Sequence, residues 1–241
     1  MIRRFLILVY AFGAYLLASA SLFYLMGFIA DVGVPKSIND GDVISTWRAI
    51  LVDVGLVGLF GLHHSITART SFKRWWTKVV PTPIERATYL YMTTIMTMIL
   101  VALWQPIPVV IWSVESNLLV SIVRATYIAI WVMMTAATFH FGYFGFFGLS
   151  QAWQYLKRKS PEPHKMTARY LYAMVRHPIS LGWMIAPFFV PRFTVSQFVF
   201  AMATVAYIIV ATRFEETDLI EDLGDSYRNY QKRVPRFIPF S

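Results

Sequence analysis

The sequence predicts an all-α fold, a polytopic bundle of about five membrane-spanning helices. Of its 241 residues, 57% are hydrophobic and only 15% are charged, whereas soluble domains carry about 25% charged residues. The mean hydropathy is +0.52. Charge-free runs such as residues 5–30 and 87–114 exceed the ~20 residues that cross a bilayer core. The composition therefore excludes a disordered chain and a freely soluble enzyme, and the absence of cysteine excludes disulfides and thiolate metal sites.

The charge pattern places the first two spans. Residues 5–29 are apolar and follow Arg3 and Arg4. This run is too long for the apolar core of a signal peptide, so we expect an uncleaved first span. The second span is expected at about residues 43–62, although it carries the acidic residue Asp53.

Proline and charge bound the next two spans. The third begins after Arg86 and ends near Trp104, because Pro106 favours a break in the helix. The fourth covers roughly residues 125–147, which contain no charged side chain.

The C-terminal third predicts a hairpin followed by a surface helix. Two apolar pieces, residues 178–191 and 193–212, are expected to form a helical hairpin whose first arm is short or tilted, because the first piece is shorter than a typical span. Beyond it, residues 217–233 have apolar side chains at helical spacing, interrupted by Gly224. That pattern predicts an amphipathic interfacial helix.

The distribution of Lys and Arg predicts the orientation. With the N-terminus inside, 18 of the 22 basic residues fall in inside segments, as expected for cytoplasmic loops. Residues 63–86, 150–177 and 213–241 are then expected together on the cytoplasmic side. Because topology accounts for the formal charge of +9, the expected partner is the lipid bilayer and not nucleic acid. No repeat or linker divides residues 1–241, so a single domain is expected.

Polar residues meet at the two ends of the predicted hairpin. Arg176 and His177 open it, and Arg213, Glu215 and Glu216 close it. Because both ends of a hairpin are neighbours, a cationic pair should face an acidic pair at the membrane boundary, where it could bind a zwitterionic ligand beside an apolar pocket. The alternative is structural: His177 precedes a helix, and the Arg213 side chain extends to the membrane surface.

Histidines raise the questions of acid–base chemistry and of metal binding. His63 and His64 would point about 100° apart on a helix, so they suit one metal poorly. His64 alone suits proton transfer, and the alternative is an interfacial histidine without chemistry. His140 has no acidic residue in its span, so no metal site is expected. The aromatic and glycine-rich run at residues 139–148 fits either helix packing or a wall of a small apolar cavity.

Several motifs resemble a known enzyme family. R-H-P-I-S-L-G-W from Arg176, F-E-E-T-D-L from Phe214 and G-D-S-Y-R-N-Y-Q-K-R-V-P-R-F-I-P from Gly224 resemble the C-terminal signature of the isoprenylcysteine carboxyl methyltransferase superfamily, which consists of integral membrane enzymes. V-P-K-S-I, H-S-I-T-A-R from His64, F-K-R-W-W and P-I-E-R-A-T-Y from Pro83 look like its methanethiol S-methyltransferase branch, related to NnrU-type proteins. The resemblance spans nearly the whole chain.

The resemblance implies a bacterial-type inner-membrane enzyme that methylates a small thiol, methanethiol, with S-adenosylmethionine as cofactor. Residues 150–241 would form the cofactor part and residues 1–149 the substrate side. The cofactor would be bound by Arg176, His177, Leu181, Gly182, Glu215, Glu216, Tyr227, Tyr230 and Arg233. The substrate would be bound by Ser65, Tyr143 and Phe144. We expect His64 to take the thiol proton and Arg213 to stabilise the thiolate.

The chain also departs from the family's pattern. A His and an acidic residue are usual where it has Tyr143 and Gly145, and a Tyr is usual in place of Ser180. Two alternatives therefore stay open: a membrane methyltransferase for another thiol or a lipid, and a non-enzymatic NnrU-like membrane protein. The oligomeric state is left open.

Overall fold

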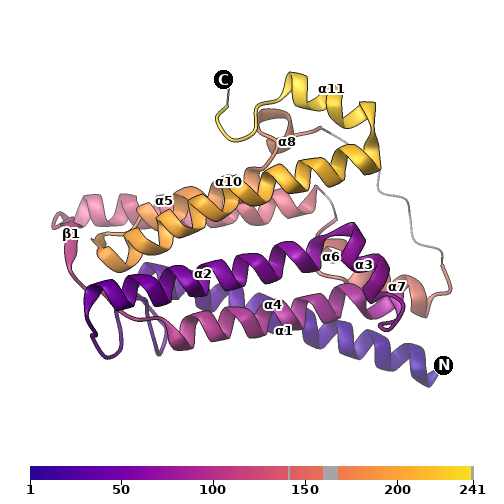
Figure 1. Cartoon of the computed structure of the whole chain (residues 1–241), viewed down its shortest axis with the longest axis horizontal. Helices are drawn as coiled ribbons and strands as arrows, with labels where there is room; N and C mark the ends of the chain where they lie inside the picture. Colours follow the sequence, from indigo (N-terminus) through magenta and orange to yellow (C-terminus); the bar gives the residue numbers. More distant parts are fainter. Residues whose placement is uncertain (141, 160–167, 240–241) are drawn as a thin grey trace.

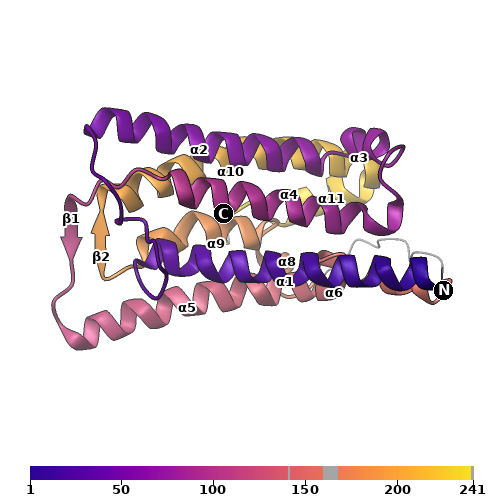
Figure 2. The ribbon, with the colours of Figure 1, turned by 90° about the horizontal axis from the view of Figure 1, so that it is seen from below.

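Five long apolar helices lie side by side and form the body of the molecule (Figures 1 and 2). The structure is a computed structural model that describes residues 1–140, 142–159 and 168–239. Each of the five is long and apolar enough to cross a membrane. They are α1 (Ile2–Ala30), α2 (Thr46–Ala68), α4 (Thr82–Leu103), α5 (Asn117–Phe139) and α10 (Val195–Leu223). The predicted all-α polytopic fold is confirmed.

The outer surface of the bundle is apolar. Large side chains such as Phe23, Leu118 and Val132 point outward and are exposed, a pattern that suits lipid and not water. Inside, Phe28 and Trp104 are fully buried and pack edge to face, with ring centroids 6.0 Å apart. The fold therefore has an apolar core as well as an apolar outer surface.

Helix α2 contacts α10 closely through a glycine. A Cβ atom added at Gly61 would lie 2.4 Å from Cδ2 of Tyr207, so only glycine allows this approach. One turn further along α2, the Ser65 hydroxyl lies 3.1 Å from the Tyr207 hydroxyl. This contact brings the end of α2 next to α10.

The predicted hairpin is present, with a short first arm. It consists of α9 (Pro178–Ile185), the 3₁₀ turn η1 (Ala186–Phe188), β2 (Arg192–Thr194) and α10. A two-stranded sheet that the sequence did not predict joins it to the preceding part of the chain, because β1 (Val110–Ser113) pairs antiparallel with β2. Trp112 stacks on Phe193 with ring centroids 3.9 Å apart. The sheet lies at the end of the bundle opposite the N-terminus (Figure 2).

The predicted fourth span, residues 125–147, was wrong at both ends. Helix α5 begins at Asn117 and ends at Phe139, and α6 (Tyr143–Phe146) and α7 (Leu149–Leu156) follow as separate short helices. Gly142 and Gly148 both have φ of 77°, a conformation that breaks a right-handed helix. Hydropathy alone does not detect such breaks.

The predicted amphipathic C-terminal helix is present, but its predicted bounds, residues 217–233, were wrong. Helix α10 continues without a break to Leu223, and α11 (Asp225–Arg233) starts after Gly224, which has φ of 57°. The apolar residues of that stretch therefore belong to two helices that turn back on each other. They meet in a small cluster in which Leu219, Ile220 and Leu223 pack on Tyr227, Tyr230 and Val234.

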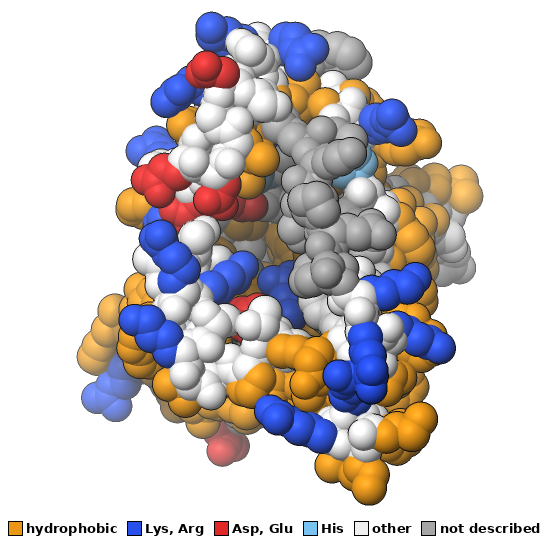
Figure 3. Space-filling view, turned by 90° about the vertical axis from the view of Figure 1, so that its right-hand side faces the viewer, with side chains coloured by type: hydrophobic (Ala, Val, Ile, Leu, Met, Phe, Trp, Pro, Cys, Tyr) orange, Lys and Arg blue, Asp and Glu red, His pale blue; other side chains and the backbone are white. Residues whose placement is uncertain are grey.

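Besides α6, four short helices lie in the half of the molecule that ends at the N-terminus (Figure 1). They are α3 (Thr70–Trp76), α7, α8 (Leu171–Met174) and α11. Figure 3 looks onto this end, where Lys, Arg, Asp and Glu side chains surround a hollow. The described parts of the three segments expected on one side of the membrane thus do lie at one end of the fold.

Candidate functional site

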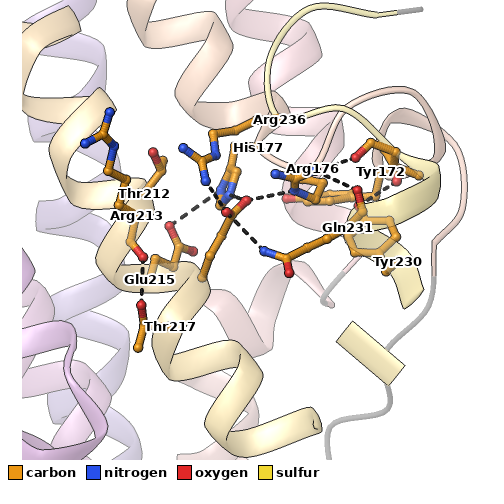
Figure 4. Close-up of polar contacts among 12 residues, drawn as sticks. Tyr172, Arg176, His177, Thr212, Arg213, Glu215, Thr217, Tyr230, Gln231 and Arg236 are labelled. Atoms are coloured by element: carbon orange, nitrogen blue, oxygen red, sulfur yellow. Dashed lines mark hydrogen bonds and ion pairs between the residues drawn. The ribbon is translucent and has the colours of Figure 1, made fainter. Parts of the chain in front are cut away.

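The carboxylate of Glu216 is the centre of a polar cluster, and Figure 4 shows the side chains of Arg176, His177, Gln231 and Arg236 pointing toward one another. Arg176 Nε donates to Glu216 Oε1 at 2.7 Å, and His177 Nε2 lies 3.1 Å from the same oxygen. Gln231 Nε2 donates to Oε2 at 3.2 Å, and a guanidinium nitrogen of Arg236 donates to Oε2 as well. Both carboxylate oxygens are therefore shared by groups from the two residues before α9, from α11 and from the C-terminal tail (residues 234–239).

The backbone of the tail holds the start of the hairpin in place. The amide of Arg176 donates to the carbonyl of Pro235 at 2.9 Å, and that of His177 to Arg236 at 3.2 Å. The Arg176 guanidinium also donates to the carbonyl of Val234 at 2.5 Å. The tail thus runs alongside residues 176–177 and encloses the cluster.

Burial separates the roles of the two glutamates. The side chains of Glu216, His177 and Arg176 are 3%, 6% and 10% exposed, and a charge this buried is stable only when paired. Glu215 is 59% exposed, and its Oε2 lies 3.6 Å from His177 Nδ1, which is too long for a good hydrogen bond. Glu216 therefore stabilises the fold of this end, while the Glu215 carboxylate can still bind a ligand.

Two tyrosines of α11 pack against this cluster. Tyr227 and Tyr230 are buried, with ring centroids 5.7 Å apart. Burial raises the pKa of Tyr230 to about 12, so its hydroxyl stays protonated and donates to the Tyr172 carbonyl at 2.6 Å. Burial, and next the charge of Glu215, raise the pKa of the Tyr172 hydroxyl. The Tyr230 hydroxyl therefore links α11 to α8.

The other residues expected on the cofactor side make contacts of other kinds. Gly182 is buried, and a Cβ atom there would lie 2.3 Å from Cγ of Met134, so this glycine lets α9 pack on α5. Leu181, half-buried beside it, donates its amide to the His177 carbonyl at 2.9 Å. Arg233 is exposed, and its Nε donates to the Asn229 carbonyl.

A second group of residues surrounds His64 at the end of α2. The Tyr89 hydroxyl lies 2.9 Å from His64 Nδ1, and the Phe60 ring stacks on the imidazole with centroids 5.8 Å apart. The Arg86 guanidinium lies 4.9 Å from the centre of the Tyr89 ring. The imidazole is held on one face by Phe60 and at its edge by Tyr89, so its orientation is restricted.

The aromatic turn of α6 presents its two expected substrate residues in different directions. Tyr143 packs on Phe147, with centroids 5.0 Å apart, and its hydroxyl lies 3.4 Å from that of Tyr15. Phe144 is exposed and lines an apolar surface groove of about 510 Å³ with residues of α1 and α7. Arg86 Nε donates to the Phe146 carbonyl at 2.9 Å, which ties this turn to α4.

Arg213 is exposed, and its side chain points away from His177 (Figure 4).

Sequence reasoning missed Gln231, Arg236 and Tyr89, the groups that complete the two clusters. Gln231 and Arg236 stand in the C-terminal motif, but nothing in the sequence indicated that the tail folds back onto Glu216. Within the described ranges, no three His, Asp or Glu side chains gather as a metal site would require.

Comparisons with known proteins were made for the whole chain. No family model matches it, and no solved structure does. Curated relatives named methanethiol S-methyltransferase do. The protein of Crocosphaera subtropica is 38% identical over 99% of this chain and 94% of its own length. That of Pseudomonas deceptionensis is 41% identical over 88% and 80%. That of Mycobacterium tuberculosis is 35% identical over 99% and 98%.

Replacing the central carboxylate should destabilise this end. In Glu216→Gln, Arg176 and Arg236 lose their buried counter-charge, and we expect a loss of about 3 kcal/mol or more in the free energy of unfolding. Thermal unfolding in detergent measures it. Glu221→Gln, an exposed glutamate of the same helix, is the matched control. Equal melting temperatures for the two variants would contradict this account of Glu216.

Proposed function

Because this chain belongs to the methanethiol S-methyltransferase family, we propose that it methylates methanethiol to dimethyl sulfide with S-adenosylmethionine as methyl donor. The structural observation that carries the proposal is the polar cluster at the end of an apolar bundle. There an exposed carboxylate, Glu215, lies 3.6 Å from the buried imidazole of His177. Such a site can hold the charged groups of a donor while the reacting atoms stay in an apolar environment.

The donor side fits a zwitterionic molecule. When bound, S-adenosylmethionine supplies an electrophilic methyl group on a sulfonium, and its transfer to a thiolate neutralises two opposite charges, which favours a site shielded from water. Glu215 would bind an ammonium group or ribose hydroxyls, and His177 a carboxylate. Glu216, Arg176, Tyr227 and Tyr230 would hold the cluster in shape.

The remaining residues of the donor side have supporting parts in the proposal. Leu181 and Gly182 would line the side of the site where α9 packs on α5, since Gly182 contacts Met134. Arg233 lies on the exposed side of α11 and would meet the donor at the mouth of the site.

On the thiol side, His64 would accept the proton from the sulfur. The Tyr89 oxygen lies 2.9 Å from Nδ1 and 3.3 Å from Nε2. With Nδ1–H donating to that oxygen, the lone pair of Nε2 would act as the base. Ser65 follows His64 on α2 and would lie beside the thiol. Its hydroxyl bonds to that of Tyr207 on α10. The cation that stabilises the thiolate would be Arg213. Arg86, which lies over the Tyr89 ring, adds positive charge near the base.

The thiol would reach the site from the membrane. Methanethiol is small and apolar enough to dissolve in lipid, and the α6 turn presents Phe144 to the outer surface and Tyr143 to the interior. We place the end that carries the N-terminus in the cytoplasm of a bacterial-type inner membrane, because that end holds most of the Lys and Arg residues.

The proposal predicts a volatile product. Membranes that contain the protein, given methanethiol and S-adenosylmethionine, should release dimethyl sulfide, which gas chromatography measures. Membranes from cells with an empty vector are the control. If no methylated product exceeds that control for methanethiol or for any of a panel of longer thiols, the enzyme proposal is wrong. A product from a longer thiol alone would reassign the substrate.

Loss of the imidazole should slow the reaction. We expect His64→Ala to lower kcat/KM for methanethiol by about 10²- to 10⁴-fold, the usual contribution of a general base, with unchanged amounts of protein in the membrane. The matched control is Tyr91→Phe, which removes a hydroxyl bonded to the Tyr10 carbonyl. No step of the proposed reaction uses that contact. Wild-type rates for His64→Ala at every pH would exclude it as the base.

A further inference from the structure

One ion pair connects the N-terminal half of the chain to α10. Arg69 Nη1 donates to Asp218 Oδ1 at 2.8 Å, and the guanidinium lies 4.8 Å from the centre of the Phe214 ring. The other ion pairs among the described residues all join groups between positions 176 and 236. Arg69 and Asp218 belong to two motifs that the sequence singled out, yet the proposed chemistry uses neither.

Each partner of the ion pair lies a few residues after a residue of the proposed site. Arg69 stands where α2 ends and α3 begins, in extended backbone with φ of −63° and ψ of 140°, five residues after His64. Asp218 lies three residues after Glu215 on α10, so both project from the same face of that helix. The pair therefore joins the helix that carries the proposed base to the helix that carries the donor-side glutamates.

The partial exposure of the ion pair indicates that it orients the two helices more than it stabilises the fold. Its side chains are 28% and 25% exposed, and ion pairs that contact water contribute little to overall stability. A guanidinium held by both a carboxylate and an aromatic face has a restricted orientation, however. At this end of the α2 and α10 contact, the Ser65 and Tyr207 hydroxyls supply a second polar link, at 3.1 Å.

We infer that Arg69 and Asp218 are positioning residues that set the spacing between the thiol side and the donor side of the site. The inference rests on the proposed function. Methyl transfer needs an in-line approach of sulfur and methyl, and a misplacement of about 1 Å can cost about 10²-fold in rate. Breaking the pair should therefore slow transfer while the donor, held by groups of α9, α10 and α11, still binds.

A charge exchange tests the inference on the full-length protein. Arg69→Asp and Asp218→Arg each place like charges together, and we expect kcat/KM for methanethiol to fall about 10- to 100-fold. The double exchange restores opposite charges and should recover at least about fivefold over either single variant. The Kd for S-adenosylmethionine should stay within about threefold of wild type throughout, which a general loss of structure would not allow.

The control is a charge exchange in an ion pair that does not join the two sides of the site. Arg228 and Asp225 form an exposed ion pair at 3.0 Å within α11, and Arg228→Asp and Asp225→Arg should leave kcat/KM unchanged. If either charge reversal at 69 or 218 prevents folding, Arg69→Gln and Asp218→Asn replace it and should show the same split between rate and donor affinity.

Three results would overturn the inference. Wild-type rates in the single variants would do so, as would a double exchange less than about fivefold faster than either single variant. Equal losses of donor affinity and rate would also contradict it, because they would show a general structural effect. An inactive wild type would instead refute the proposed function itself, and the role of the pair with it.

Discussion

Two guanidinium groups, an imidazole and an amide converge on the carboxylate of Glu216, at the point where α10 leaves the apolar bundle. A carboxylate that is 3% exposed carries a large desolvation cost, and only this many donors can offset it. Meeting that requirement draws together the start of α9, the helix α11 and the C-terminal tail. The neighbouring Glu215 is thereby presented to the hollow end of the molecule without a full partner of its own.

Helix α10 links this cluster to the rest of the fold. Along one helix, Tyr207 bonds to Ser65 beside the proposed base, and Glu216 forms the polar cluster two turns further on. A continuous α-helix is stiff over that distance, so Tyr207 and Glu216 keep a fixed separation. The apolar bundle supplies the dry surroundings, and its polar end supplies the charged groups.

Hydropathy and charge could predict five spans, a hairpin with a short arm and the meeting of residues 176–177 with residues 215–216, because these follow from length and from connectivity. The helix breaks at Gly142, Gly148 and Gly224 could not be predicted, since each depends on a positive φ that leaves no hydropathy signal. The pairing of β1 with β2 and the contact between Tyr89 and His64 depend on which helices pack together. Single-sequence patterns do not contain that information.

The central claim is that the cluster around Glu216 forms the binding site for the methyl donor, apart from the thiol side. Calorimetric titration of the detergent-solubilised protein with S-adenosylmethionine tests it most directly. The account predicts saturable binding that weakens about tenfold or more in His177→Ala, which loses contacts to a charged ligand, and that is unchanged in His64→Ala. The absence of binding, or an equal affinity in the two variants, would contradict it.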